Sequence, residues 1–544
     1  MTQGVDCGSG VRLERNVRCA MRDGTVLVSD HYYPSGEGTH PTLLVRQPYG
    51  KEIATTVVYA HPVWFARHGY NVVIQDVRGR GGSAGEFYPF RNEGRDGFDT
   101  IEWLARRPEC NGQVGMYGFS YQGLTQLLAA AERPPSLKVM APAMTAVDLF
   151  NGWFYFNGAL RLSSTLSWGI QMLREDARRL GLRDASRALE RAWVNVRNES
   201  LHAPYGECPV ISNYVVDWIR HNSPGEYWSS QDVSEKLSQI TIPALHVSGW
   251  NDTYLKGSVD GFDALRAIAP DQYLIAGPWI HIPWGRRVGD QDFGPEAELD
   301  TDAILLRWFN HWLKGSGEFS GEPPIRHFVI GRNEWRSASR WGSGELIFYL
   351  QSDGNANSSK GAGVLTGELP ESDQGRDIFV YDPEVPVLAP AGSDQSILEQ
   401  GNNLLVYTTA PLENAIDVLG RPKLCLHASS SALQTDFVGK LIHVSKNNRA
   451  TLVSVGVARS QYLFPEYKAD RIHCWEFEFE PISVHFPAGD RVRLEIASSA
   501  FPLFDRNPGN DTHPADADHW TWIRSTQMIL HDAKHPSCLI VPVP

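Results

Sequence analysis

The first 150 residues carry three short apolar runs, and each run ends close to a turn-forming or polar residue. The runs are TLLVRQPYG, YNVVIQDVRG and QVGMYGFS, and the helical pattern FDTIEWLARRP separates the second from the third. Apolar runs of this length are typical of strands buried on both faces of a parallel sheet. Two later runs, IPALHVSGWND and QYLIAGPWIH, repeat the pattern. The sequence therefore predicts an α/β domain whose sheet is completed by a second stretch of chain.

The hydrophobic period changes twice along the chain, and these changes predict the domain organisation. Between the two α/β segments, apolar residues recur at three- and four-residue steps, which predicts an inserted set of helices. The C-terminal part contains short alternating runs separated by turn residues, which predict an all-β sandwich or jelly roll. We therefore expect an α/β domain over 1–146 and 241–318, a helical cap over 147–240 and a β domain over 319–544.

Composition and charge exclude several classes of function. The chain has 63 acidic residues and 50 Lys or Arg residues, and its net charge of −13 argues against binding to nucleic acid. Seven scattered cysteines without a C-x-x-C pair predict reduced thiols, and no metal or cofactor motif is recognised. The chain has neither a signal-peptide pattern nor a long apolar segment, so we expect a cytoplasmic protein without a membrane anchor.

The strongest local motif is Gly118-Phe119-Ser120-Tyr121-Gln122-Gly123, between a predicted strand and a predicted helix. A serine in a tight turn between a strand and a helix is typical of the nucleophile elbow. The second glycine stands one residue later than in the G-x-S-x-G pattern. The motif alone therefore leaves two interpretations of Ser120, a catalytic nucleophile and an ordinary turn serine.

A catalytic serine needs an imidazole to take its proton and a carboxylate to orient that imidazole. Asp252 and His281 each follow a predicted strand, in SGWND and AGPWIH. Because the carboxyl ends of parallel strands meet at one edge of a sheet, we expect both residues to lie near Ser120. Their order along the chain is that of an α/β-hydrolase.

A competing motif follows the second apolar run, where residues 79–84 (GRGGSA) match the dinucleotide-binding pattern G-x-G-x-x-G/A. That pattern should open a helix, but the text continues as GEFYPF, in which proline and clustered aromatic residues disfavour a helix start. A nucleotide site is therefore not expected here.

Nine segments spread along the chain carry a resemblance to a known family: 48–51, 76–85, 111–123, 249–252, 277–281, 333–335, 381–383, 435–437 and 498–502. Through them the chain resembles the cocaine esterase family of serine hydrolases, which includes X-Pro dipeptidyl peptidases, glutaryl-cephalosporin acylases and α-amino acid ester hydrolases. The resemblance implies an α/β-hydrolase domain with an inserted helical cap and a C-terminal jelly roll. It also implies Ser120 as nucleophile, His281 as base and Asp252 as orienting acid. By the same resemblance, the backbone N–H of Tyr121 and the hydroxyl of Tyr49 would form an oxyanion hole.

An aromatic run in the predicted cap supplies candidates for the substrate pocket. The resemblance implies that some of Trp153, Phe154, Phe156 and Trp168 line the pocket, although packing inside the cap explains such residues equally well. We therefore expect an esterase or acylase for a small molecule with a hydrophobic or aromatic acyl group. An X-Pro dipeptidyl peptidase, an α-amino acid ester hydrolase or acyltransferase, and an inactive binding protein are the alternatives. A homodimer is a further expectation.

Overall fold

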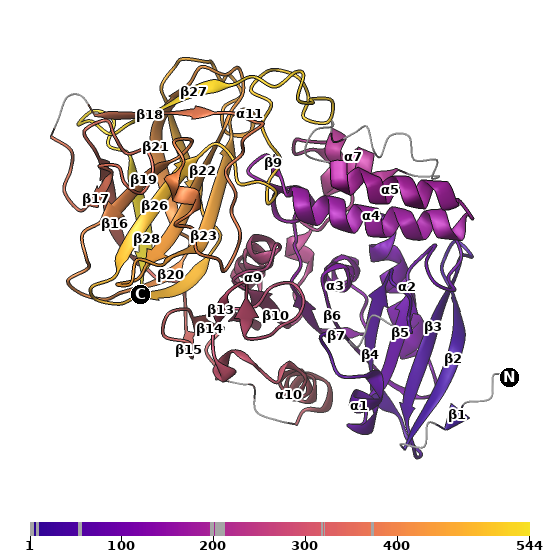
Figure 1. The fold of residues 1–544 in the computed structure, drawn as a ribbon. Helices are drawn as coiled ribbons and strands as arrows, with labels where there is room; N and C mark the ends of the chain where they lie inside the picture. Colours follow the sequence, from indigo (N-terminus) through magenta and orange to yellow (C-terminus); the bar gives the residue numbers. More distant parts are fainter. Residues whose placement is uncertain are drawn as a thin grey trace.

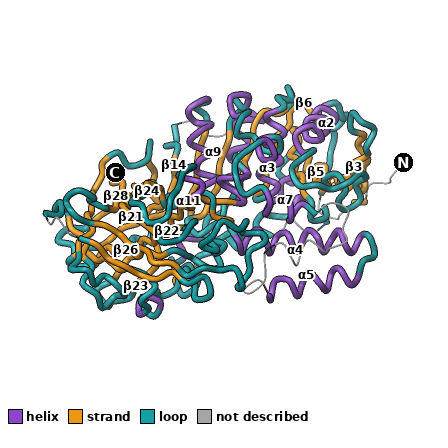
Figure 2. The backbone as a smooth tube through the Cα atoms, turned by 90° about the horizontal axis from the view of Figure 1, so that it is seen from above, coloured by secondary structure: helices purple, strands orange, loops and turns teal. Residues whose placement is uncertain are grey.

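The computed structural model describes residues 5–6, 10–52, 57–195, 201, 213–316, 319, 321–371 and 375–544. A helix-covered sheet forms one half of the molecule and a β domain the other, and the cap helices lie across one side of the first half (Figures 1 and 2). The predicted α/β-hydrolase fold with a cap and a C-terminal β domain is confirmed. None of the helices in the described part of the chain is long and apolar enough to span a membrane.

The first sheet has a parallel centre and antiparallel edges. Its strand order is β1-β2-β3-β5-β4-β6-β7-β10-β11-β14-β15, and pairing is parallel from β5 through to β14. The two stretches of chain that were predicted to share a sheet therefore do so. The strands are β1 (Val5–Asp6), β2 (Val11–Ala20), β3 (Val26–Pro34), β4 (His40–Gln47), β5 (Asn71–Asp76), β6 (Cys110–Phe119), β7 (Leu137–Ala143), β10 (Ala244–Gly249), β11 (Gln272–Gly277), β14 (Ile325–Val329) and β15 (Glu334–Ala338).

Helices cover both faces of this sheet, which explains why its strands have continuous apolar sequences. In β5 the side chains of Val72 and Ile74 join the core on one face, and Val73 joins the core on the other. This alternation follows from the two-residue period of a strand. Helices α2 (Glu93–Ala105) and α3 (Tyr121–Ala131) cover the Val73 face. Helices α1 (Pro62–Arg67) and α10 (Thr301–Lys314) cover the opposite face, while α9 (Leu255–Ile268) packs on β10 and β11.

The structure differs from the prediction at the start of the β domain. Strands β14 and β15 were placed after the boundary at residue 318, yet β14 pairs with β11, β15 pairs with β14, and both extend the first sheet. An edge strand has the same short alternating pattern in either kind of sheet, so the sequence could not assign it.

The cap consists of helices joined by a short hairpin. The apolar residues of its longest helix, including Leu166, Ile170 and Leu173, are buried, whereas Arg174 and Arg178 are exposed and pair with Glu190 and Glu175. The elements of the cap are η2 (Leu149–Phe154), β8 (Tyr155–Phe156), β9 (Ala159–Leu160), α4 (Leu162–Arg179), α5 (Arg183–Asn195), α7 (Tyr214–Arg220), α8 (Glu226–Ser229) and η3 (Leu237–Gln239).

The β domain is a predominantly antiparallel sandwich with a large apolar core. Its main sheet has the path β18-β27-β21-β28-β16-β17-β19-β26-β22-β23, and β24 pairs with β21 beside that path. The elements are β16 (Gly344–Gln351), β17 (Val364–Thr366), β18 (Arg376–Tyr381), β19 (Leu405–Thr409), β20 (Ile416–Gly420), β21 (Lys423–Ser430), β22 (Asp436–Val444), β23 (Ala450–Arg459), α11 (Ser460–Leu463), β24 (His473–Glu478), β25 (Ile482–Phe486), β26 (Arg491–Ala497), β27 (Ser525–Leu530) and β28 (Cys538–Val543).

A buried ion triad joins the β domain to the cap. The guanidinium of Arg459 donates two hydrogen bonds to Asp436, at 2.9 and 2.8 Å, and two to Asp505, at 3.0 and 2.9 Å. Asp505 also accepts the backbone N–H of Leu160, in the cap hairpin, at 2.8 Å. Burial raises the pKa of Asp505, and the positive charge of Arg459 opposes that shift. Arg459 is therefore the cation that allows two carboxylates to remain buried where the two domains meet.

We expect Arg459→Met to lower the free energy of unfolding by about 3–5 kcal/mol, because it leaves two buried carboxylates without a cation. The control is Arg332→Met, which removes a solvent-screened pair with Asp417 and should change the free energy of unfolding far less than Arg459→Met does. Urea unfolding followed by tryptophan fluorescence measures both changes. Equal unfolding midpoints for the two variants would contradict the role of Arg459 as the buried cation that stabilises the contact between the β domain and the cap.

Candidate active site

Ser120 occupies a strained turn between β6 and α3. Its φ of 61° and ψ of −125° lie outside the regions that residues with a side chain normally adopt, a strain of about 1–3 kcal/mol. The turn is held by hydrogen bonds from the N–H of Ser120 to the carbonyl of Ala143, at 2.8 Å, and from the N–H of Gly123 to the carbonyl of Ser120, at 2.9 Å. The geometry is that of a nucleophile elbow.

The displaced glycine of the motif has a steric explanation. A Cβ at position 123 would lie 2.8 Å from the Cβ of Thr145 and 2.9 Å from the carbonyl oxygen of Ala143. Only glycine therefore allows α3 to start this close to the end of β7. The tight approach that G-x-S-x-G places two residues after the serine occurs here three residues after it.

His281 and Asp252 contact each other at the carboxyl edge of the sheet. Asp252 follows β10 and His281 follows β11, and the His281 Nδ1 lies 2.8 Å from Oδ1 of Asp252. The carboxylate can only accept, so Nδ1 carries the proton and Nε2 is left as the proton acceptor. The Asp252 carboxylate is fully buried, while the His281 side chain keeps 27% of its surface exposed.

The two tyrosines of the predicted oxyanion hole lie beside Ser120 in different ways. The hydroxyl of Tyr49 lines the same cavity as Ser120 and accepts a hydrogen bond from the indole N–H of Trp168 at 3.2 Å. Burial raises the pKa of Tyr49 to about 12, so its hydroxyl keeps its proton at neutral pH. Tyr121 is the first residue of α3, and its backbone N–H belongs to the first turn, where helix N–H groups have no partner within the helix.

A cavity of about 530 Å³ opens onto Ser120 and His281. Its wall is mostly apolar and is formed by residues of the hydrolase domain and of helix α4 of the cap. Of the predicted pocket residues, Trp168 lines this cavity. The other described residues on its wall are Tyr49, Val57, Phe119, Gln122, Ser164, Ser167, Gln171, Thr253, Tyr254 and Ile282.

The other predicted pocket residues belong to the packed interior of the cap. Trp153 stacks on Tyr254 with ring centroids 4.3 Å apart, Phe154 stacks on Trp218 at 4.4 Å, and Phe156 contacts the β domain at Phe504. None of the three is on the wall described for the cavity at Ser120. Their aromatic sequence therefore reflects burial, and the sequence contains no signal that separates it from pocket lining.

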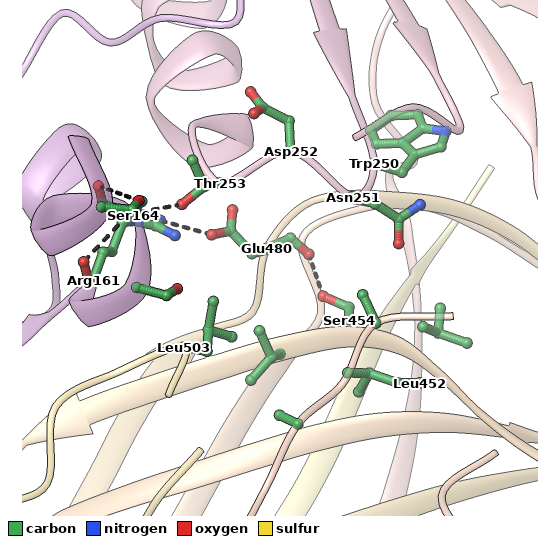
Figure 3. Close-up of a pocket in the computed structure, with 16 residues that line it drawn as sticks. Arg161, Ser164, Trp250, Asn251, Asp252, Thr253, Leu452, Ser454, Glu480 and Leu503 are labelled. Atoms are coloured by element: carbon green, nitrogen blue, oxygen red, sulfur yellow. Dashed lines mark hydrogen bonds and ion pairs between the residues drawn. The ribbon is translucent and has the colours of Figure 1, made fainter. Parts of the chain in front are cut away.

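A second cavity of about 320 Å³ lies where the hydrolase domain, the cap and the β domain meet (Figure 3). It shares Ser164, Ser167 and Thr253 with the first cavity, so the two spaces adjoin. Arg161 of the cap donates to Glu480 of the β domain at 2.7 Å across this space. Burial raises the pKa of Glu480, and Oε2 of this carboxylate has no hydrogen-bond partner among the described residues. Sequence reasoning missed Glu480, because nothing in the pattern FEFEP distinguishes it from an edge residue of a strand.

The glycine-rich stretch after β5 forms a turn around Asp76. A Cβ at Gly81 would lie 1.9 Å from Oδ2 of Asp76, and the N–H of Gly82 donates to that oxygen at 2.9 Å. The next helix begins only at Glu93. The glycines therefore serve a close backbone approach to Asp76, in line with the sequence-based rejection of a dinucleotide fingerprint.

Comparison with known proteins identifies relatives of both halves of the chain. Residues 23–283 match the family described as X-Pro dipeptidyl-peptidase (S15 family), and 318–540 match its C-terminal non-catalytic domain. The cocaine esterase of Rhodococcus sp. (strain MB1 Bresler) is 32% identical in an alignment of 566 positions, gaps included, that covers 97% of this chain and 98% of that protein.

Solved structures of similar proteins share the whole fold. An aminopeptidase from a marine sediment archaeon, Thaumarchaeota archaeon, has a TM-score of 0.83 at 25% identity, covering 98% of this chain and 96% of its own. An α-amino acid ester hydrolase has a TM-score of 0.79 at 23% identity, covering 100% and 98% of the two chains, and this likeness concerns the fold.

Proposed function

Because the chain belongs to the X-Pro dipeptidyl-peptidase (S15) family of hydrolases, we propose that it cleaves an ester or amide through an acyl-enzyme on Ser120. The observation that carries this proposal is the 2.8 Å contact between His281 and the buried Asp252, with His281 and Ser120 on the wall of one cavity. Family membership alone cannot assign a reaction, since function depends on the site.

In the proposed reaction the Ser120 hydroxyl oxygen attacks the carbonyl carbon of the substrate. Nε2 of His281 takes the hydroxyl proton and returns it to the departing alcohol or amine. Asp252 keeps the proton on Nδ1 and stabilises the imidazolium that forms. Water then attacks the acyl group, with His281 again as base, and releases the acid and free Ser120.

The negative charge of the tetrahedral intermediate needs hydrogen-bond donors in place before the reaction. The Tyr121 backbone N–H and the Tyr49 hydroxyl are proposed as these donors. The raised pKa of Tyr49 supports this role, because a tyrosinate could not donate. Trp168 donates to the oxygen of that hydroxyl, which leaves the hydroxyl hydrogen available to an oxyanion.

The described wall of the cavity at Ser120 favours a hydrophobic or aromatic acyl group and contains no acidic residue. We therefore propose a carboxylesterase or acylase. A peptidase or α-amino acid ester hydrolase would have to bind a free ammonium group. The adjoining cavity has two described carboxylates on its wall, Asp252, which contacts His281, and Glu480, which is already paired with Arg161. The cytoplasmic location and the homodimer stay predictions.

The first experiment measures hydrolysis of p-nitrophenyl acetate, butyrate and benzoate and of Gly-Pro-p-nitroanilide. We expect the wild type to hydrolyse the esters and to be labelled by a fluorophosphonate probe. Ser120→Ala should abolish both the turnover and the labelling. Ser136→Ala, which removes a hydroxyl bonded to Glu102, should retain both. Preferred cleavage of the anilide would favour a peptidase. An unlabelled Ser120 with no turnover would indicate a binding protein on the same fold.

We expect Asp252→Asn to lower kcat by about 10⁴-fold, because an amide at this position favours the wrong His281 tautomer. The change leaves the volume of the buried side chain almost unchanged, so KM and the unfolding midpoint should move little. Asp260→Asn, on α9 and paired with Lys256 and Arg421, is the matched control. Wild-type kcat in Asp252→Asn would rule out the proposed acid.

We expect Tyr49→Phe to lower kcat by about 10²–10³-fold, because one donor to the oxyanion is lost. With the pKa of Tyr49 at about 12, the donor persists as pH rises and is lost only near that value, so the deficit should be constant from pH 6 to 9. Tyr33→Phe, at another buried tyrosine whose pKa is raised to about 12, controls for the loss of a hydroxyl. A deficit that vanished within this pH range would argue against the role of Tyr49.

A further inference from the structure

Cysteine and histidine side chains gather on the outward face of the β domain. Strand β21 carries Cys425 and His427, and residues two apart on a strand point to the same face. The intervening Leu426 and the preceding Leu424 point to the opposite face and are buried in the core. The side chains of Cys425 and His427 therefore both project from the outer face of the sheet.

The pairing of the neighbouring strands adds two more thiols to this face. Antiparallel pairing places Cys474 of β24 opposite His427, and Cys538 of β28 opposite Cys425. Residues directly opposite each other in adjacent strands share a face. Figure 2 labels β21, β24 and β28 within one region of the domain. Because β24 and β28 flank β21, Cys474 and Cys538 lie on opposite sides of Cys425.

The distances within the first three residues suit a tetrahedral metal ion. The sulfurs of Cys425 and Cys474 are 3.6 Å apart, and the ligand atoms of Cys425, His427 and Cys474 all lie within 4.8 Å of one another. Two thiolates at the usual zinc–sulfur distance of about 2.3 Å are about 3.8 Å apart in a tetrahedron. Nδ1 of His427 is buried and has no hydrogen-bond partner among the described residues, although the ring of His535 lies nearby. The imidazole of His427 therefore keeps a nitrogen that no described residue engages.

We propose that Cys425, His427 and Cys474 form a binding site for Zn²⁺, with water as the fourth ligand. Two thiolates and an imidazole are ligands that zinc prefers over magnesium and calcium. On binding, both thiols lose a proton to solvent and form Zn–S bonds, so no oxidant or reductant is required. The ion would link β24, which lies beside the main path of the sheet, to its partner strand β21.

This proposal departs from the sequence-based prediction of no metal site, which rested on the absence of the C-x-x-C, H-E-x-x-H and EF-hand patterns. That spacing suits a tight turn, whereas C-x-H on a strand brings two ligands to one face. The third ligand comes from a strand that the sequence alone cannot place. Of the seven cysteines, the five in described parts of the chain are free thiols, and Cys7 and Cys208 lie outside the described residues.

The test uses the full-length protein after reduction and removal of metal. Zn²⁺ is titrated against a chromophoric chelator, and Co²⁺ is added separately as a spectroscopic probe. We expect one Zn²⁺ per chain and a Co²⁺ spectrum with sulfur-to-cobalt charge transfer and tetrahedral ligand-field bands. Cys425→Ser and Cys474→Ser should each weaken Zn²⁺ binding by about 100-fold or more, since losing an outer partner of a ligand alone costs roughly 10–100-fold. His427→Gln should weaken it similarly.

Cys110→Ser is the control, because it removes a buried free thiol on β6 of the hydrolase domain, away from the proposed ligands. It should bind Zn²⁺ as the wild type does. Zn²⁺ should raise the thermal midpoint of the wild type and of Cys110→Ser, but not that of the Cys425→Ser/Cys474→Ser double variant.

Three results would overturn the site. They are equal Zn²⁺ affinity in the double variant and the wild type, a Co²⁺ spectrum without sulfur charge transfer, and loss of binding in Cys110→Ser. Ester hydrolysis is measured in parallel and should be unchanged in every variant, so this test does not depend on the proposed function.

Discussion

The parallel hydrogen bonding of β6, β7, β10 and β11 is the constraint on which the candidate active site depends. It brings Ser120, Asp252 and His281 to one edge although the whole cap lies between the first and the second in sequence. Because parallel strands all end at the same edge, each strand delivers the residue that follows it to a shared space. The strained Ser120 backbone and the buried Asp252 carboxylate are tolerated because packed strands hold them from beneath.

The sequence allowed the ends of β6, β10 and β11 to be predicted, because buried parallel strands have continuous apolar sequences and these three end at or beside a glycine. The predictions were less successful where one sequence pattern is compatible with two different structural positions. Trp153 and Trp168 belong to one aromatic segment, yet only Trp168 borders the cavity at Ser120. Strand β14 alternates like a strand of the sandwich but pairs with the first sheet. Contacts such as Arg161 with Glu480 depend on how whole domains meet, which no local pattern encodes.

The cap is held from two directions by different kinds of interaction. Toward the hydrolase domain, Arg80 stacks on Phe87 with its guanidinium 3.7 Å from the ring centre and pairs with Asp176 of the cap. Toward the β domain, the cap hairpin is bonded to Asp505 within the Arg459 triad. Two polar anchors at opposite ends, with aromatic packing between them, fix the position of Trp168 above the Tyr49 hydroxyl.

The second cavity shows that the C-terminal domain contributes to the space beside the candidate active site. Its floor includes Ser454, Leu452 and Glu480 of the β domain, while Asp252 and Thr253 form part of its opposite wall. The sandwich is therefore a wall of the space beside the candidate active site and more than a neighbouring module. Cutting the chain after the hydrolase sheet would expose the loop of Asp252 to water. A truncated chain would lack one side of this space, and substitutions in loops of the β domain that never contact Ser120 would change its shape.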